Sequence, residues 1–354
     1  MTERLPKHAS IFRVLRNRLL RGDYESRLPG LRSLAEELRT DPKTVQCALA
    51  QLEGVGLVKR VERQGTFAVA DEELARRSGR TYVSIVAPPP YIVHGDASFW
   101  VTAVLYAFYR AAEAHHLEIM LRLSKDPAHG IATVMDDAHD NHCAGTCLLS
   151  IPVRREELLQ LASLGGGIVV ADWDIDKGLV PCVLFDNVKA GRLAAKHLLE
   201  LGHRRILGVA AASLSPSQEN RWAGFQEAIR EAGLPDQERI VDMNRLQSSI
   251  LAHLRNENPP TAIVTSSADR ADETIQLAES AGIRVPQDLS VLTYGGFLNT
   301  VRGKHITTVV MDYEEMGRRA FENLLKSDSL QPPHCERIPC SLVQGMTTGP
   351  APMD

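Results

Sequence analysis

The chain has 354 residues, of which 44% are hydrophobic and 24% charged, and its formal net charge at pH 7 is −4. This length is too great for one ordinary domain and predicts two or three, each with enough apolar side chains for a core of its own. No apolar run approaches the ~20 residues that a membrane span needs, and the first residues lack the apolar segment of a signal peptide. The six cysteines show no disulfide-like framework. We therefore expect a reduced, cytoplasmic protein with no membrane partner.

Charge is distributed unevenly along the chain. Residues 1–70 contain 13 Lys and Arg against 8 Asp and Glu, a net charge of +5, whereas the remainder contains 27 against 36, a net charge of −9. A basic head on an acidic body is typical of a module that binds DNA, joined to one that does not. Chance variation in surface charge is the alternative explanation.

The basic segment is predicted to begin with helices. Apolar residues recur at helical spacing in residues 11–19 and again in residues 31–38. Asp41 and Pro42 form a helix-start signal, because the carboxylate can accept from free backbone N–H groups and proline suits the first helical position. The helix that starts here buries one stripe of side chains: Val45, Ala48, Leu49 and Leu52.

Two short strands, residues 57–61 and 66–69, follow these helices, with a hairpin turn at 62–65. Two helices joined by a tight turn make a helix-turn-helix, whose second helix enters the major groove, and the hairpin is its wing. Arg32 would fork onto guanine or phosphate, and Gly65 would let the wing backbone approach the duplex closely. Ordinary exposed surface is the alternative for each residue. The predicted DNA contacts are Arg32, Ser33, Lys43, Thr44, Gln46, Gln64 and Gly65.

Several separated pieces of this segment match a known pattern in the same order. They are Leu28-Pro-Gly-Leu-Arg-Ser-Leu-Ala35, Thr44-Val-Gln-Cys-Ala-Leu49, Val55-Gly-Leu57 and Gln64-Gly-Thr-Phe67. They resemble the L-P-S-x-R-x-L-A run, the recognition helix and the wing of the GntR family of bacterial regulators. Gly30 stands where the family usually has Ser, and Pro42 where it often has Arg. The resemblance covers residues 1–70 and implies that double-stranded operator DNA is a partner, bound by a homodimer.

The rest of the chain is predicted to be an α/β domain. Residues 71–80 are polar and charged and are interpreted as a linker. Beyond them, apolar strands alternate with helices, the pattern of a parallel sheet covered on both faces. The arrangement occurs twice, which predicts two doubly wound lobes. The predicted strands are 82–87, 118–123, 145–150, 168–171, 206–211, 262–265 and 291–294, and the predicted helices are 99–116, 128–139, 155–164, 187–201, 217–232 and 268–281.

Motifs in the second half indicate what this domain resembles. They include Phe185-Asp-Asn187 with Gly191, Ala194 to Ile206, Arg221-Trp-Ala-Gly-Phe225, Val285 to Val291, and Ile306-Thr-Thr-Val309 with Met316-Gly317. These runs resemble the effector-binding domain of the LacI/GalR family, related in fold to periplasmic binding proteins. The resemblance spans about residues 81–350 and implies a two-lobed periplasmic-binding-protein-like domain with a hinge and no cofactor. It places lobe 1 at about 81–183 and 309–326, and lobe 2 at about 184–308 and 327–354.

By family position, the resemblance also implies the residues that would bind a small-molecule effector. Aromatic rings offer apolar faces to sugar C–H groups, while Asp and Arg bond hydroxyls or carboxylates. The family's Asn-Asp pair aligns with Ser267-Ala268 and its Tyr-Asp-Asp with Tyr294-Gly-Gly296, so two acidic or amide groups are missing. The effector is therefore left open: a sugar, a sugar acid or a similar metabolite. The implied effector residues are Phe99, Trp100, Ser150, Asp172, Trp173, Arg221, Ser267 and Tyr294.

These features predict a transcriptional regulator, a repressor of a carbohydrate or related metabolite pathway, rather than an enzyme. The chain lacks a G-x-S-x-G elbow, a phosphate-gripping loop and a plausible triad. His and Cys residues in 139–147 lack the paired spacing of a zinc site, so no metal is expected. An effector-independent repressor with a degenerate pocket and, further off, an α/β enzyme are the alternatives.

Overall fold

The structure is a computed structural model of the chain. It describes residues 11–12, 14–16, 18–19, 24, 27–54, 57–61, 64–68, 81–88, 97–124, 126–140, 142–164, 167–175, 179–210, 215–241, 245–296, 300–301, 303–326 and 334–352. The predicted linker, residues 71–80, lies outside these. The chain divides into two compact units. Unit 1 comprises residues 1–89, 108–183 and 318–336, and unit 2 comprises residues 90–107, 184–317 and 337–354.

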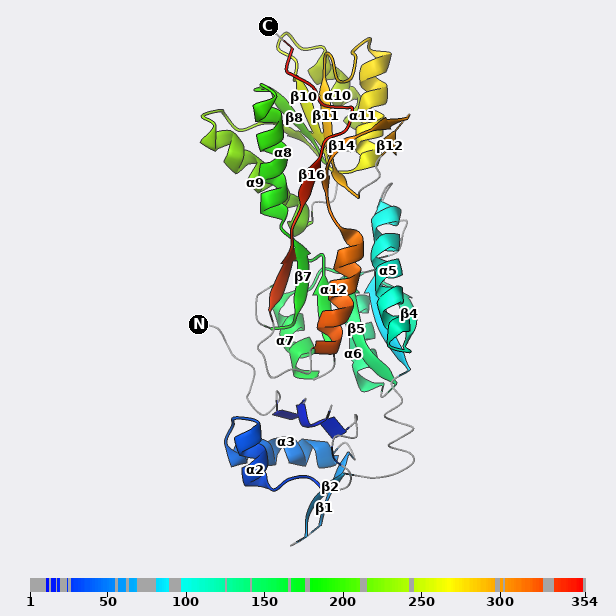
Figure 1. Ribbon diagram of the computed structural model, residues 1–354, viewed down its shortest axis with the longest axis vertical. Helices are drawn as coiled ribbons and strands as arrows, with labels where there is room; N and C mark the ends of the chain where they lie inside the picture. The colour runs from blue at the N-terminus through cyan, green and yellow to red at the C-terminus, as the bar shows by residue number, and fades with distance from the viewer. Residues whose placement is uncertain are drawn as a thin grey trace. The chain divides into compact units, whose positions relative to one another are not determined.

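The N-terminal segment of unit 1 is a winged helix, as predicted (Figure 1). Its core is built from the apolar stripes seen in the sequence, and Leu15, Leu34, Val45 and Leu52 are buried in one cluster. The elements are helical residues 11–12, 14–16 and 18–19, then α2 (Leu31–Glu37), α3 (Pro42–Gly54), β1 (Val58–Val61) and β2 (Gly65–Ala68). The apolar side chains of the described helical residues form this cluster, so the polar sides of α2 and α3 face outward.

Unit 1 also contains a six-stranded sheet in the order β15-β7-β6-β5-β3-β4. Strands β3 to β7 pair in parallel, and β3, β6 and β7 are buried along their whole length, which explains their continuous apolar sequence. The strands are β3 (Tyr82–Ala87), β4 (Glu118–Leu123), β5 (Cys143–Leu149), β6 (Ile168–Ala171), β7 (Cys182–Phe185) and β15 (Cys335–Ile338).

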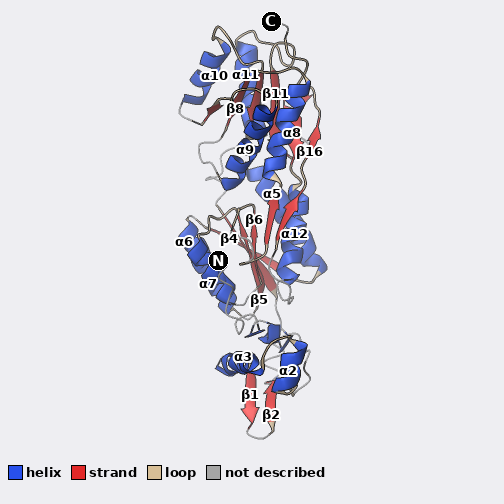
Figure 2. Ribbon diagram, turned by 90° about the vertical axis from the view of Figure 1, so that its left-hand side faces the viewer, coloured by secondary structure: helices blue, strands red, loops and turns tan. Residues whose placement is uncertain are grey.

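Helices cover both faces of this first sheet. An edge-to-face contact between Phe108 and Phe321, with ring centroids 5.3 Å apart, packs α5 (Ala97–Ala114) against α12 (Tyr313–Lys326). Figure 2 shows α6 (Pro127–His139) and α7 (Arg155–Leu164) on the opposite side of the strands from α12. The layers are those predicted for a doubly wound sheet.

The sheet of unit 2 repeats this topology in the order β16-β14-β11-β10-β8-β9. Strands β8 to β11 and β14 pair in parallel, and β16 closes the edge in antiparallel orientation. The strands are β8 (Ile206–Val209), β9 (Arg239–Ile240), β10 (Ala262–Thr265), β11 (Ser290–Gly295), β14 (Thr307–Val310) and β16 (Ser341–Val343), and a separate pair is β12 (Thr300–Val301) and β13 (Lys304–His305).

Three helices of unit 2 start at side-chain caps that the sequence contains. Figure 1 shows the strands between α8 (Asn187–Glu200) on one side and α11 (Ala268–Ser280) on the other. The remaining helices are α9 (Pro216–Glu231) and α10 (Leu246–Leu254). Asp186, Ser215 and Ser267 each accept a hydrogen bond from a backbone N–H in the first turn of α8, α9 and α11.

Strand membership differs from the sequence-based division of the lobes. Residues 309–310 belong to β14 in the second sheet, and β15 belongs to the first, although residues 309–326 were predicted for lobe 1 and residues 327–354 for lobe 2. The chain changes unit after residues 89, 107, 183, 317 and 336. Motif spacing cannot locate these positions, because strand pairing over long sequence separations sets them.

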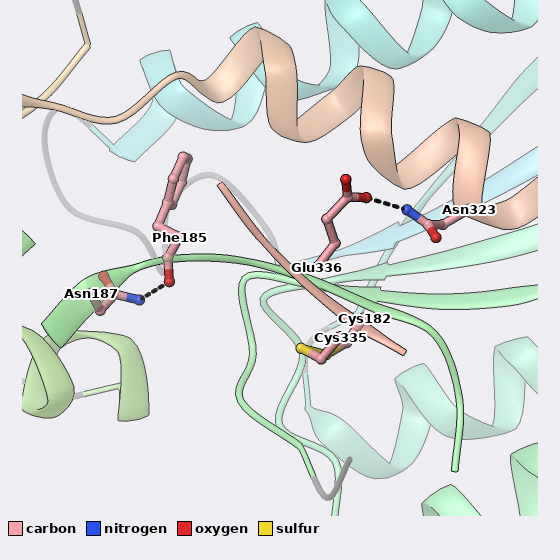
Figure 3. The surroundings of a disulfide bond; sticks show 6 residues. All are labelled: Cys182, Phe185, Asn187, Asn323, Cys335 and Glu336. Atoms are coloured by element: carbon pink, nitrogen blue, oxygen red, sulfur yellow. Dashed lines mark hydrogen bonds between the residues drawn. A yellow bond between two sulfur atoms is a disulfide. The ribbon is translucent and has the colours of Figure 1, made fainter. Parts of the chain in front are cut away.

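A disulfide between Cys182 and Cys335 corrects the expectation of a fully reduced chain. The two residues are 153 positions apart in sequence, but their Cα atoms lie only 4.4 Å apart because β7 and β15 are neighbours (Figure 3). Cysteine spacing cannot show such a pair, since the pairing of two strands creates it. Among the described helices, none is long and apolar enough to cross a membrane.

Candidate functional site

The first turn of α3 presents polar groups to the outside of the winged helix. Asp41 caps the helix as predicted: it accepts from Thr44 N at 2.9 Å and from Thr44 Oγ1 at 2.7 Å. These bonds also hold the pKa of Asp41 below its usual range. Lys43 and Gln46 are exposed beside the cap, whereas Thr44 is half-buried and its proton is already donated. The side chains of Lys43 and Gln46 therefore have no partner among the described residues, and the Thr44 hydroxyl retains only acceptor capacity.

The wing is fixed to α3 by one arginine that the sequence reading passed over. Arg60 of β1 donates from Nη2 to the carbonyl of Gln46 at 2.9 Å, and its backbone N–H donates to Glu53 at 3.1 Å. Gln64 and Gly65 are exposed where β2 begins, and the φ of Gly65 is 118°, which favours glycine. Helix and hairpin therefore form one surface.

Arg27 is a second residue missed by the sequence reading. It forms a β-bridge with Phe67, and Leu28 N donates to Thr66 O at 2.9 Å, so the segment before α2 lies along the wing. The Arg27 guanidinium stands 6.0 Å from the Phe67 ring centre, and its Nε would be 3.1 Å from a Cβ placed on Gly65. The backbone at Arg27 and Leu28 therefore lies beside the hairpin as a third segment. No local sequence pattern predicts this contact.

The seven predicted DNA-contact residues all lie in described parts of the winged helix. Arg32 and Ser33 are exposed in the first turn of α2, Lys43, Thr44 and Gln46 lie on α3, and Gln64 and Gly65 are at the hairpin. Among the described residues, Arg27, Arg32 and Lys43 have no carboxylate partner. Their positive charges are available to phosphate groups.

In unit 1, two predicted effector residues meet at the carboxyl end of the sheet. Ser150 follows β5 and Asp172 follows β6, and Ser150 Oγ donates to Asp172 Oδ2 at 2.7 Å. Their φ angles are 51° and 55°, values that non-glycine residues rarely adopt. Such strained residues concentrate at binding sites. Trp173, next in sequence, is half-buried.

Trp100 lies in α5, among aromatic rings. Its ring centre is 5.9 Å from that of Tyr313, which in turn makes an edge contact with Phe185 at 5.4 Å. Tyr313 and Phe185 were not among the predicted effector residues. The contact with Tyr313 shows that Trp100 packs within an aromatic cluster. The side chain of Phe99 lies outside the described residues.

In unit 2, Arg221 is positioned by close contact between two helices. A Cβ on Gly191 of α8 would lie 1.9 Å from the Arg221 carbonyl, and one on Gly224 of α9 would lie 2.1 Å from the Val188 carbonyl. Only glycines allow this approach, which brings Arg221 to Asn187. The Asn187 Oδ1 accepts from Arg221 Nε at 3.3 Å and Nη2 at 3.2 Å. Figure 3 shows Asn187 also donating to the carbonyl of Phe185.

Tyr294 and Arg221, both predicted, come together in the structure. The guanidinium carbon of Arg221 lies 4.7 Å above the Tyr294 ring centre, a cation–π distance. Tyr294 is only 6% exposed, and burial raises its pKa. Ser267 instead caps α11, and its Oγ accepts from Arg270 N at 3.4 Å. Its neighbour Ser266, not predicted, faces the pocket described next.

A pocket lies at the carboxyl ends of β8, β10 and β11, entirely within unit 2. This end of a parallel α/β sheet is where such folds bind ligands. The hollow measures about 340 Å³ including adjoining solvent. Its lining includes Arg221 and Tyr294 from the predicted set, and Gln218, Trp222, Arg239 and Ser266 that the sequence reading did not single out.

Comparison with protein families matches two separate segments of the chain. Residues 7–68 match the gntR family of bacterial regulatory proteins, and residues 195–348 match a periplasmic binding protein-like domain. The chain is 37% identical over 152 residues to the HTH-type transcriptional regulator DegA of Bacillus subtilis (strain 168), covering 40% of this chain and 44% of that protein. It is 30% identical over 165 residues to the HTH-type transcriptional repressor PurR of Yersinia pestis (strain Pestoides F), covering 45% and 48%. The chain thus spans about half the length of these relatives.

Solved structures extend the likeness to most of the chain. A LacI transcriptional regulator from a Rhodococcus species aligns with a TM-score of 0.64 at 24% identity, over 76% of this chain and 99% of that one. The Lac repressor dimer bound to operator and the anti-inducer ONPF aligns with a TM-score of 0.66 at 18% identity, over 79% and 99%. At these identities the likeness establishes the fold. The chain thus contains a winged helix that matches the gntR family model and an α/β domain that matches the periplasmic binding protein-like model and has the fold found in LacI regulators.

Proposed function

We propose that the protein is a DNA-binding transcriptional repressor whose operator affinity is controlled by a small molecule bound to the α/β domain. The observation that carries this proposal is the joining of two modules in one chain. One is a winged helix with unpaired exposed cations, and the other is an α/β domain with a pocket at the carboxyl ends of its strands. The curated relatives are transcriptional regulators, which supports a regulator over an α/β enzyme.

In this proposal two winged helices bind a palindromic operator. A single winged helix makes few base contacts, and twofold symmetry doubles them. The fold shared with a Lac repressor dimer bound to operator supports a homodimer. Lys43 and Gln46 would contact base edges or phosphates, and Arg32 would reach the duplex from α2. Such a protein would work in the cytoplasm, where its DNA partner is.

Arg27 belongs to the same proposed surface. It lies beside Gly65, at the point where the wing backbone would approach the duplex, and the Phe67 ring limits its movement. A cation held in place loses less freedom when it binds a phosphate. We therefore assign Arg27 a phosphate contact at the wing.

Operator binding is tested by fluorescence anisotropy of a labelled fragment from the protein's own promoter. Lys43→Ala should weaken binding by about 1–3 kcal/mol if Lys43 contacts base edges. Arg27→Gln should weaken binding to every DNA sequence by a similar factor. It should also reduce the slope of log affinity against log salt concentration by about one. Lys196→Ala, an exposed lysine of α8, is the control and should change neither quantity. No binding to the promoter, or unchanged binding in both winged-helix variants, would refute the proposed interface.

The effector should change operator affinity, and DNA should change effector affinity by the same factor, because both act on one equilibrium. We expect the effector to weaken DNA binding, in the manner of an inducer. The same anisotropy assay, titrated with effector at constant salt, gives the sign. An effector that binds without changing the anisotropy would remove the allosteric part of the proposal and leave the DNA-binding part intact.

A further inference from the structure

The pocket in unit 2 contains polar atoms that have no partner. The hydroxyl of Tyr294 and the Oε1 of Gln218 are both buried, and neither makes a hydrogen bond to any described residue. Tyr294 is only 6% exposed. A buried polar group without a partner is destabilising, and native proteins rarely keep one without a reason. Both residues line the same pocket.

The charged side chains that line this pocket have one sign. The lining contains two guanidinium groups, those of Arg221 and Arg239, and no described carboxylate. Arg239 Nη2 donates to both carboxylate oxygens of Glu219, at 3.0 and 3.1 Å, and Glu219 is not part of the lining. Arg221 bonds only to the neutral amide of Asn187 among the described residues, so its positive charge is not compensated there.

Protonation of Tyr294 adds a donor to the same place. Burial raises the pKa of its phenol, so the hydroxyl stays protonated near neutral pH. Arg221 and Tyr294 can therefore both donate to one anionic group. The Gln218 amide has both a donor and an acceptor, and can bond to an adjacent hydroxyl or amine.

The indole ring of Trp222 also lines the pocket. Trp222 stacks on Phe225 with ring centres 5.0 Å apart and planes 9° apart, and Arg239 lies 5.3 Å from the Trp222 ring centre. A Cβ on Gly208 would be 2.7 Å from the Trp222 ring, so this ring lies directly on the strand.

We infer that this pocket binds the carboxylate of a small organic acid, with Arg221 and Tyr294 donating to the carboxylate and Gln218 bonding to a neighbouring hydroxyl or amine. The inference rests on the proposed function, in which this domain binds an effector, and specifies the chemical class of that effector. A site for a neutral sugar would need acceptors for several hydroxyl donors, and the lining contains no described carboxylate to supply them.

The test compares acids with neutral sugars of the same skeleton. Gluconate, galactonate and glucuronate are titrated into the full-length protein by calorimetry, against glucose and galactose, at matched ionic strength. At least one acid should bind at least about tenfold more tightly than its neutral counterpart, a difference of about 1.4 kcal/mol. Inorganic phosphate and glucose 6-phosphate form a separate arm. Binding of the phosphates alone would overturn the carboxylate assignment.

Variants locate the binding. Arg221→Gln should lower the affinity for the acid by about tenfold or more. Tyr294→Phe, which keeps the ring in place, should lower this affinity by a smaller factor. Arg230→Gln removes an exposed arginine of the same helix that pairs with Asp236, and should leave binding unchanged. Circular dichroism and melting curves establish that each variant is folded. An unchanged affinity for the acid in both pocket variants would overturn the inference. The inference would also be overturned if none of the acids bound.

A labelled operator separates this inference from the proposed function. If a neutral sugar binds and releases the operator, effector control stands and the carboxylate inference falls. If an acid binds through Arg221 but operator affinity stays the same, the inference stands and the proposed coupling falls.

Discussion

The two sheets share one topology, yet their carboxyl ends differ. In unit 1, Ser150 after β5 donates to Asp172 after β6 at 2.7 Å, so these polar groups satisfy each other. In unit 2, Ser266 follows the corresponding strand β10, and the corresponding strand β11 ends at Tyr294-Gly295. The Tyr294 hydroxyl has no partner among the described residues. The same fold thus carries one closed polar pair and one open site. A shared topology locates the ligand end of a sheet, but only the side chains decide whether that end is already satisfied.

The polar side chains at the ends of the two sheets are also held in place in different ways. Ser150 and Asp172 are held by their own strained backbone, with φ angles of 51° and 55°. Arg221 is instead held from a distance, by the contact of α8 with α9 and by the Asn187 amide. Mutations should therefore affect the two sheets in different ways.

Gly191→Ala should have the largest effect, because it separates the two helices that position Arg221. The added Cβ would lie 1.9 Å from a backbone carbonyl, which cannot move aside as a side chain can. We expect the free energy of unfolding to fall by about 3 kcal/mol, as for severe overpacking. Urea denaturation measures it. Gly30→Ala, where a Cβ meets nothing within 4 Å, is the control and should be nearly neutral.

Acidification should destabilise unit 2 before unit 1. His203 of unit 2 is fully buried between Thr261 and Ser290, and this burial lowers its pKa. The folded state then binds fewer protons than the unfolded state, so stability is complete above pH ~6.5 and is lost as pH falls below it. In unit 1 the hydrogen bond from Arg154 lowers the pKa of Glu157, whose contribution is lost only as pH falls below ~4.

The measurement is urea denaturation of the wild type between pH 7.5 and 5.5. His203 should contribute a loss of up to about 1.4 kcal/mol per pH unit. His203→Gln should flatten the pH dependence, whatever it does to stability at pH 7.5. His129→Gln, at an exposed histidine of unit 1, should leave the dependence as it is. An equally steep dependence in His203→Gln would show that other groups cause the loss.

Ser150→Ala should break the closed pair of unit 1. Asp172 would lose a 2.7 Å donor, and we expect a loss of about 1 kcal/mol in the free energy of unfolding. Ser248→Ala, at an exposed serine of α10, provides the baseline for a serine-to-alanine change. A loss no larger than this baseline would show that the Ser150–Asp172 bond contributes nothing.

Tyr294→Phe should have a small effect of opposite sign. It removes a buried hydroxyl that lacks a partner and keeps the ring under Arg221, so the ligand-free protein should gain up to about 1 kcal/mol. The same variant should bind carboxylates less well. Opposite changes in stability for Ser150→Ala and Tyr294→Phe would establish the contrast between the two sheets. A destabilised Tyr294→Phe would indicate that a water or protein group already satisfies the hydroxyl.

Much of the fold could be predicted from the sequence because its signals are local. The apolar spacing of the winged helix, the cap at Asp41 and the continuous apolar strands all depend on neighbours within a few residues. Family motifs added Arg221 and Tyr294 to the site. The motifs did not show that Ser266 faces the pocket while Ser267 caps a helix, since adjacent serines look alike in sequence.

The sequence by itself determined the order of the modules and the elements within them, because turns, caps and apolar periodicity are properties of short segments. Only the tertiary structure decided that Cys182 meets Cys335, that Arg27 lies on Phe67, and that Gln218 and Tyr294 share one pocket without partners. Each of these depends on two segments far apart in the chain and on the exact register and direction in which they pack. A one-residue shift in a strand reverses which side chains face inward, and local preference cannot set it.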